Sequence, residues 1–575
     1  MLRYTLSQRH AAGTITGKAL LIGLLFHLCL VSVRAQDLSR EDLRPITLSG
    51  TLITAAENYS IPGLDTRRPV NSARLYFNPT LSIYGVDLPF SFVLSTTERS
   101  FNQPFNQFGV SPRYKWLTLH GGYRSMYISD FTLNDAVILG GGAEIDGDWF
   151  HFRGMYGRFR RSVEEDRPDS STVIRAVYER IGWTANAGIG GDRAGLNLTV
   201  LHAWDDSTSL DRAPTTGDVF PSENLVLGMS GKLGFAGGAF VVDGEAAGSF
   251  FSRDTFLPMV EDDDVVTASA GLYDTRLSTR LNFAFRLGGT YFADLWSLRL
   301  QYARVEPEYE TMGALYTQSD LEDITIIPTF QLADGSLRAS GSLGFRHDNL
   351  FDDRIATTDR VIGSANVNWM PDPSFGMDGQ YSNYSMSSSA GSLPVNDSTR
   401  IENVSESYSI TPRYILNSEG AQHFFMLFLT RQLFADENIL TGATSDNDVF
   451  TAVLSYTNSF VAGYGFSAAL QFTEISTVFQ TDIIRGVTVG VQSNWLDNDL
   501  NTDLTYTHNL TRAGSEADTD TQDIIALSAR YRVGLADVLE FRFQYNTYDA
   551  VNPLRRSYAG TVTRLQYSRR FGFGQ

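Results

Sequence analysis

The sequence predicts an all-β protein, a single large antiparallel transmembrane β-barrel of about 26 strands, and three observations support this prediction. Apolar and polar residues alternate in runs of ten or more. Short turns alternate with longer polar links along the chain. Only 19% of the residues are charged, whereas soluble globular domains have about a quarter.

The alternation is clearest between Val538 and Thr547. There Leu539 and Phe541 are separated by Glu540 and Arg542, and the pattern continues to Thr547. A period of two gives each strand one apolar face and one polar face. A soluble β-sandwich shows the same period, but its strands have about five residues. Runs of ten or more match the length of a tilted strand that crosses a bilayer.

The connections between the predicted strands are of two kinds. Most longer links are polar, as in 204–221, 254–275 and 306–322. Short turns on one side and longer links on the other are typical of outer-membrane barrels, in which the short turns are periplasmic and the longer loops lie outside. The short turns lie near residues 85–87, 115–116, 146–147, 191–192, 236–237, 293–294, 334–335, 371–373, 418–420, 462–463, 497–499 and 536–537.

Twelve short turns and thirteen longer links give 26 strands, the first near 45–58 and the last near 557–573. Before them, Arg3, Arg9 and Lys18 precede an apolar core over 19–33. Fifteen apolar residues favour a secretory signal peptide over an uncleaved anchor. We therefore expect a signal peptide over 1–35, cleaved near Ala35, a short periplasmic segment over 36–44, and a barrel over 45–575. No N-terminal plug domain is expected.

Two segments carry a family resemblance. The C-terminal strand reads Leu565-Gln566-Tyr567-Ser568-Arg569-Arg570-Phe571-Gly572-Phe573 and is similar to the aromatic terminal strand that the barrel-assembly machinery binds. Residues 112–161 contain Gly121-Gly122-Tyr123 and Gly140-Gly141-Gly142, and they resemble poorly characterised outer-membrane β-barrel proteins of Bacteroidota-like bacteria. The resemblance implies fold and location and brings no catalytic residues.

Several charged side chains fall on the polar faces of the strands. An arginine at mid-depth in the lipid face costs roughly 2–4 kcal/mol, so we expect these residues to face the lumen. They either stiffen the wall as charge pairs, with partners such as Asp243 and Glu245, or line a selective path for solutes. The expected lumen-facing set is Arg280, Arg286, Arg299, Arg530, Arg532, Arg542, Arg564 and Glu540.

The densest acidic run is Glu261-Asp262-Asp263-Asp264, which we interpret as a solvated outer-loop tip, with Ca²⁺ binding as the alternative. Together with acidic residues of other loops it predicts an acidic outer rim. The histidines beyond the signal peptide have no metal-ligand or Ser/His/Asp spacing. We expect no enzyme activity, cofactor or metal. These histidines are His120, His151, His202, His347, His423 and His508.

Two functions remain open. The first is a channel or transport barrel for small solutes with weak ion selectivity, narrowed by infolded loops or closed by a separate plug. The second is a non-enzymatic scaffold, adhesion or secretion-complex barrel whose outer loops or lumen bind a partner protein, such as a periplasmic protein or lipoprotein. Expected partners include outer-membrane lipid and the barrel-assembly machinery. The net charge of −19 argues against a nucleic-acid partner, because phosphate contacts need a basic face.

Overall fold

The computed structural model describes residues 46–573 except 63–68, 97–106, 167–173, 192, 216–218, 261–271, 355, 391–401, 437, 439–441, 515–518 and 552–554. The predicted signal peptide, the segment 36–44 and the acidic run Glu261–Asp264 lie outside the described residues. The barrel itself is one unit, which begins at Ile46.

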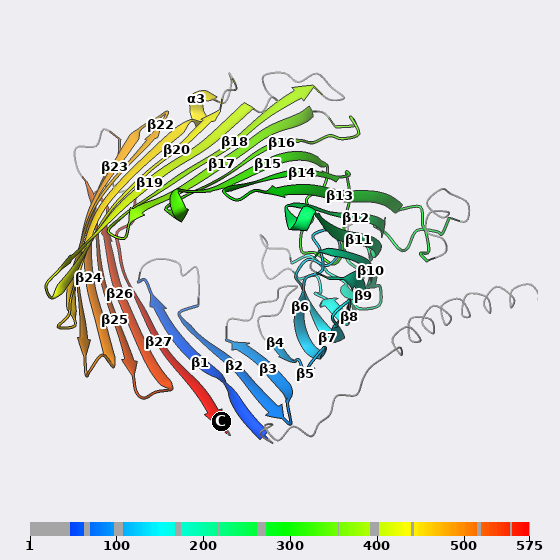
Figure 1. The fold of residues 1–575 in the computed structure, drawn as a ribbon, viewed down its shortest axis with the longest axis horizontal. Coiled ribbons are helices and arrows are strands. Elements are labelled where there is room, and N and C mark those ends of the chain that lie inside the picture. Colours follow the sequence, from blue (N-terminus) through cyan, green and yellow to red (C-terminus); the bar gives the residue numbers. More distant parts are fainter. Residues whose placement is uncertain are drawn as a thin grey trace, which may run out of the picture. The chain divides into compact units, whose positions relative to one another are not determined.

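The strands follow one another around the wall in chain order (Figure 1). The first fourteen are β1 (Ile46–Ser60), β2 (Asn71–Ile83), β3 (Val86–Ser95), β4 (Gln107–Val110), β5 (Arg113–Tyr114), β6 (Leu117–Met126), β7 (Ala136–Asp146), β8 (Phe150–Arg160), β9 (Glu179–Gly190), β10 (Ala194–Asp206), β11 (Glu223–Phe235), β12 (Phe240–Ser252), β13 (Thr279–Phe292) and β14 (Trp296–Val305).

The remaining strands continue the same order. They are β15 (Leu321–Leu332), β16 (Leu337–His347), β17 (Ala356–Asp372), β18 (Phe375–Ala390), β19 (Glu402–Ser418), β20 (Ala421–Asp436), β21 (Asn447–Phe460), β22 (Tyr464–Thr477), β23 (Thr481–Trp495), β24 (Leu500–Arg512), β25 (Asp520–Arg532), β26 (Asp537–Asp549) and β27 (Tyr558–Phe573). Three short helical turns are η1 (Ala236–Gly238), η2 (Ala333–Gly335) and α3 (Gly442–Ser445). Among the described residues, no helix is long and apolar enough to pass through a membrane.

The sheet closes on itself because β1 pairs with β27 as well as with β2, antiparallel in both cases. The 27 strand segments correspond to 26 strands of the barrel wall, because β4 and β5 are two pieces of one strand. That strand pairs with both β3 and β6. Ser111 and Pro112 interrupt that strand, and proline has no N–H for the ladder. The predicted count of about 26 strands is confirmed.

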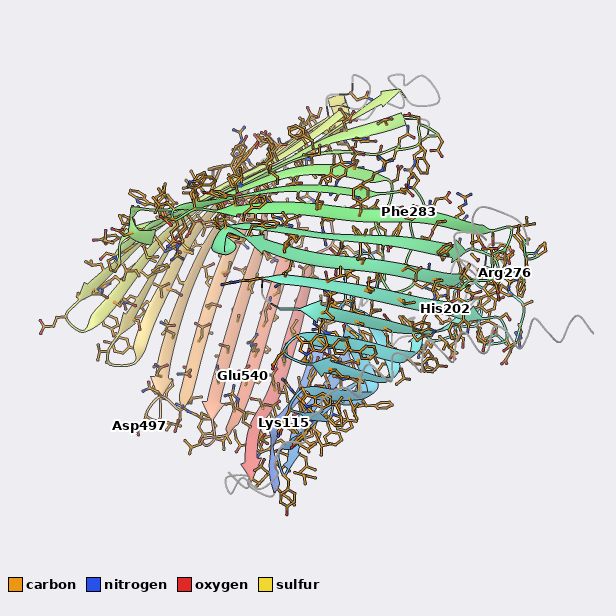
Figure 2. All side chains as sticks on the ribbon, turned by 45° about the vertical axis from the view of Figure 1, so that its right-hand side comes forward. Lys115, His202, Arg276, Phe283, Asp497 and Glu540 are labelled. Carbon is orange, nitrogen blue, oxygen red and sulfur yellow. The ribbon has the colours of Figure 1, made fainter. Side chains whose placement is uncertain are left out.

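All twelve predicted short turns connect neighbouring strands at one end of the barrel. At the first of them, Tyr84 and Gly85 have φ of 49° and 82°, and positive φ at two successive residues suits the right-handed twist of a tight hairpin. The described parts of the longer links lie at the other end. In Figure 2, Lys115 and Asp497 mark short turns and Arg276 marks a long link.

Candidate functional site on the inner wall of the barrel

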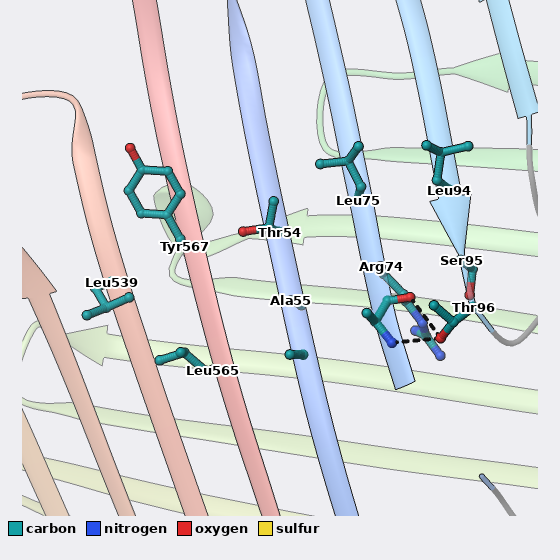
Figure 3. A pocket seen from close by; sticks show the side chains of 12 residues that line it. Thr54, Ala55, Arg74, Leu75, Leu94, Ser95, Thr96, Leu539, Leu565 and Tyr567 are labelled. Carbon is teal, nitrogen blue, oxygen red and sulfur yellow. Dashed lines mark hydrogen bonds between the residues drawn. The ribbon is translucent and has the colours of Figure 1, made fainter. Parts of the chain in front are cut away.

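The two faces of the wall differ in the way the alternation predicts. On β13, Leu281, Phe283 and Leu287 point to one face, while Arg280 and Arg286 point to the other. Figure 3 views β27, β1 and β2 from outside, with strands of the far wall behind them, and Leu75, Leu565 and Tyr567 stand on this near side. The apolar face is therefore the outer face, and the arginines line the lumen.

Figure 3 also shows a shallow pocket on the outer face. Thr54, Ala56 and Ala73 have small side chains and leave a hollow between Leu75 and Leu565. This pocket faces lipid, so it has no part in a path through the lumen.

Two of the outer links fold into the barrel. Loop 127–135 connects β6 to β7, and loop 306–320 connects β14 to β15. They bind each other although they are far apart in the sequence. The Tyr309 hydroxyl donates to the carbonyl of Phe131 at 2.5 Å, and the Thr311 hydroxyl donates to the carbonyl of Thr132 at 2.7 Å. Tyr309 is completely buried.

Loop 306–320 also binds the inner wall. The Met312 amide donates to Asn224 Oδ1 on β11 at 2.9 Å. Ser249 Oγ on β12 donates to the Glu310 carbonyl at 2.6 Å, and Asn282 Nδ2 on β13 donates to the Pro307 carbonyl at 2.8 Å. Three neighbouring strands thus hold one loop.

The space between the loops and the wall is a dry core inside the barrel. Apolar side chains from both loops meet apolar residues of β6 to β8 and of β10 to β15. Burial of this apolar surface stabilises the inward position of the loops. The cluster contains Met126, Phe131, Leu133, Ala136, Ile138, Met155, Phe159, Leu201, Ala203, Val226, Ala247, Ala284, Val305, Tyr309, Met312 and Leu321.

Ion pairs of Arg286 connect loop 127–135 to the inner wall. Its guanidinium bonds Asp130 of the loop at 2.9 Å and Glu245 of β12 at 3.1 Å. It also lies 5.6 Å from the centre of the Phe131 ring, within cation–π range. Arg280 pairs in the same way with Glu308 of loop 306–320.

Burial raises the pKa of Tyr309 above the ordinary value of a phenol. A group with a raised pKa contributes its stability below the ordinary value, which is about 10 for tyrosine. The Tyr309 hydroxyl therefore remains a donor to Phe131 through the physiological range, and this bond is lost only as the pH rises through the raised pKa.

The structure places the predicted lumen arginines in two groups. Those on β13 and β14 have close partners, as in Arg299, which bonds both oxygens of Asp243 at 2.6 and 2.8 Å. Of the four predicted arginines on β25 to β27, only Arg532 has a close carboxylate partner among the described residues. Arg530 and Arg542 share Glu540, at 3.5 and 3.8 Å. Arg564 donates to Gln566 at 2.8 Å, and Arg532 pairs at 2.9 Å with Asp499 in a short turn.

His120 is hydrogen-bonded to a serine and a glutamate, a combination of residues that also occurs in hydrolases. His120 shares a hydrogen bond of 2.9 Å with Ser111 through Nδ1 and one of 2.8 Å with Glu144 through Nε2. The His120 side chain is only 1% exposed, so a substrate's leaving group has no route to the imidazole. Glu144 also lies 3.8 Å from both Arg124 and Arg153. We interpret these hydrogen bonds between Ser111, His120 and Glu144 as structural contacts that join the interrupted strand β4–β5 to β6 and β7.

This interpretation predicts that an active-site-directed fluorophosphonate will not label the folded barrel. His120→Ala should instead lower its thermal unfolding midpoint, because it leaves Ser111 and Glu144 without a hydrogen-bond partner, at a cost of about 1–3 kcal/mol. Gel fluorescence and heat-modifiable migration measure the two effects. Labelling that disappears in Ser111→Ala would contradict it and indicate an esterase.

The other histidines have separate neighbours. His202 lies on the outer face near the outer rim, where it pairs with Glu223 at 2.9 Å and contacts the rings of Trp183, Trp204 and Tyr273. His508 pairs with Asp523 at 2.8 Å. Within the described part of the chain, no group of three or more His, Cys, Asp or Glu residues is placed to hold a metal ion.

Sequence reasoning missed the dry core and its two loops. A wet lumen predicts polar inner faces, yet Leu201, Val226 and Ala247 are inward-facing and apolar. The signal that could have revealed the core was present, because β10 to β12 carry apolar residues on both faces in their outer halves. Such a strand needs a cover on its inner side.

The fold and the two faces define a transmembrane β-barrel. No protein-family model matches the sequence, and no curated protein matches it. Among solved structures, the P pilus usher (PapC) translocation pore has a TM-score of 0.36 and 9% identity, over 91% of this chain and 99% of that one. Pseudomonas aeruginosa OccK11 (OpdR) has a TM-score of 0.26 and 9% identity, over 92% and 96%. Acinetobacter baumannii OccAB4 has a TM-score of 0.27 and 10% identity, over 92% and 99%. Similarity this low assigns neither a family nor a function to the chain.

Proposed function

We propose that the protein is an outer-membrane channel that passes small solutes with weak ion selectivity. The observation that carries the proposal is a closed 26-strand wall whose inner face carries polar and charged side chains beyond the apolar cluster that the infolded loops cover. A strand spacing of about 4.8 Å and a tilt near 40° give a cylinder roughly 50 Å across. Side chains cannot fill a lumen of that width.

The location follows from the same wall. Outer-membrane lipid would cover the outer face, with the short turns in the periplasm and the longer links outside. The barrel-assembly machinery would insert the chain. Inner-wall charges act over a Debye length of about 8 Å at physiological salt, which is short compared with the lumen radius. Most ions would therefore pass without feeling them, and selectivity would be weak.

Solute flux into proteoliposomes tests the proposal. Vesicles that contain the purified full chain should swell in isotonic arabinose, sucrose and raffinose, at rates that fall gently with solute size. Empty vesicles prepared in parallel give the baseline. Swelling no faster than that baseline for all three sugars would overturn the channel proposal and favour a plugged or scaffold barrel with a protein or lipoprotein partner.

A further inference from the structure

The inner faces of β26 and β27 bring two arginines together. Arg542 and Arg564 are direct cross-strand partners in the antiparallel register. Directly opposite side chains have Cβ atoms about 4.5–5.5 Å apart, and like charges in that position destabilise a sheet. Arg542 and Arg564 therefore repel each other unless an anion lies between them.

The carboxylates nearby do not neutralise this pair. Glu540 lies 3.8 Å from Arg542 and is shared with Arg530 at 3.5 Å, so neither contact is a hydrogen bond. Glu57 is the cross-strand partner of Arg564 on β1, yet no described carboxylate oxygen comes within 4 Å of that guanidinium. Three arginines thus face two carboxylates on this stretch of wall.

The side chains also remain accessible from the lumen. Arg542 and Arg530 are 66% and 63% exposed. By contrast, Arg299 on the opposite group of strands is 26% exposed and holds Asp243 in a bidentate pair. The β26–β27 arginines have unused N–H donors, whereas those of Arg299 are already satisfied.

We propose that Arg542 and Arg564, with Arg530 beside them, form a binding site for anionic solutes that carry a phosphate or carboxylate group. Guanidinium groups bind both kinds of oxyanion with paired, charge-assisted hydrogen bonds. The site lies near the middle of β26 and β27, about halfway along the path through the lumen. The inference deepens the proposed channel function. It rests on that function in one respect, because solutes that pass through the lumen would reach the site.

Thermal unfolding of the full chain in detergent tests the site without any measurement of transport. The unfolding midpoint, followed by heat-modifiable migration, should rise as phosphate replaces chloride at constant ionic strength, because a ligand that binds the folded state stabilises it. The same measurement in citrate and in acetate separates phosphate-specific binding from general oxyanion binding, because only general binding raises the midpoint in the carboxylate buffers as well.

The double variant Arg542→Gln with Arg564→Gln should bind phosphate about tenfold more weakly or worse, since it loses charge-assisted hydrogen bonds. In chloride it should be no less stable than the parent, because the repulsion is gone. Arg532→Gln is the matched control: it removes the same charge from a residue paired with Asp499 at the periplasmic end, and it should keep the phosphate effect.

A parent protein with the same midpoint in chloride, phosphate and carboxylate buffers would overturn the site, and so would a double variant that keeps the full shift. Bilayer conductance in chloride alone is independent of this readout. If the barrel passes no current in a bilayer but its unfolding midpoint still rises in phosphate, the channel proposal is contradicted and the anion site is supported. If it passes current but its midpoint does not rise in phosphate, only the anion site is contradicted.

Discussion

Phe541→Arg should impair folding or insertion of the barrel, while Gln544→Arg three residues away should be tolerated. Phe541 lies on the outer face of β26, opposite Ala529 and Leu565 on the neighbouring strands. An arginine at mid-depth in the lipid face costs roughly 2–4 kcal/mol. Gln544 is exposed on the inner face, where a charge remains in water.

Urea unfolding in lipid vesicles, followed by heat-modifiable migration, measures both variants against the parent. The comparison is internally controlled, because both changes add the same side chain to one strand. Equal destabilisation by the two substitutions would show that the assignment of faces is wrong on β26. Greater damage from Gln544→Arg would place lipid on the side that we assign to the lumen.

Tyr309→Ala should release loop 306–320 from the inner wall. The substitution removes a fully buried ring that packs edge-on against Phe131 at 6.2 Å between centroids, and large-to-small changes of buried aromatics cost about 3–5 kcal/mol. It also deletes the hydrogen bond to the Phe131 carbonyl. Tyr309→Phe keeps the ring and loses only that bond, which is worth about 1 kcal/mol.

A thiol placed at Met312 reports the release. Met312 is 5% exposed, and Cys29, the one natural cysteine, lies in the segment expected to be removed. Met312→Cys should react slowly with a membrane-impermeant maleimide in the parent, nearly as slowly with Tyr309→Phe, and much faster with Tyr309→Ala. If all three react at the same rate, the loop is not held by the core described above.

The strand pattern could be predicted because it is local. Each short turn, such as Tyr84-Gly85, follows from a few adjacent residues, and each face follows from a period of two. Pairing of Arg286 with Glu245 could also be anticipated, since they lie on the polar faces of the neighbouring strands β13 and β12. Arg299 of β14 instead pairs with Asp243 of β12, with β13 between them.

The infolded loops could not be predicted in the same way. Tyr309 and Phe131 are 178 residues apart, and no single-sequence pattern links two loops across the eight strands β7 to β14 that lie between them. Asp130 was likewise missed as a partner of Arg286, because a loop carboxylate has no strand face to place it. The resulting dry core depends on tertiary contacts that override the expectation of a wet lumen.

Single-channel recording in planar bilayers tests the central claim, an aqueous path through the lumen, most directly. The purified full chain should give stepwise currents of large conductance, with a small reversal potential in a salt gradient that shrinks further at high salt as screening strengthens. Heat-denatured protein provides the control. Folded barrels that insert, as judged by protease protection, but pass no current would contradict the account.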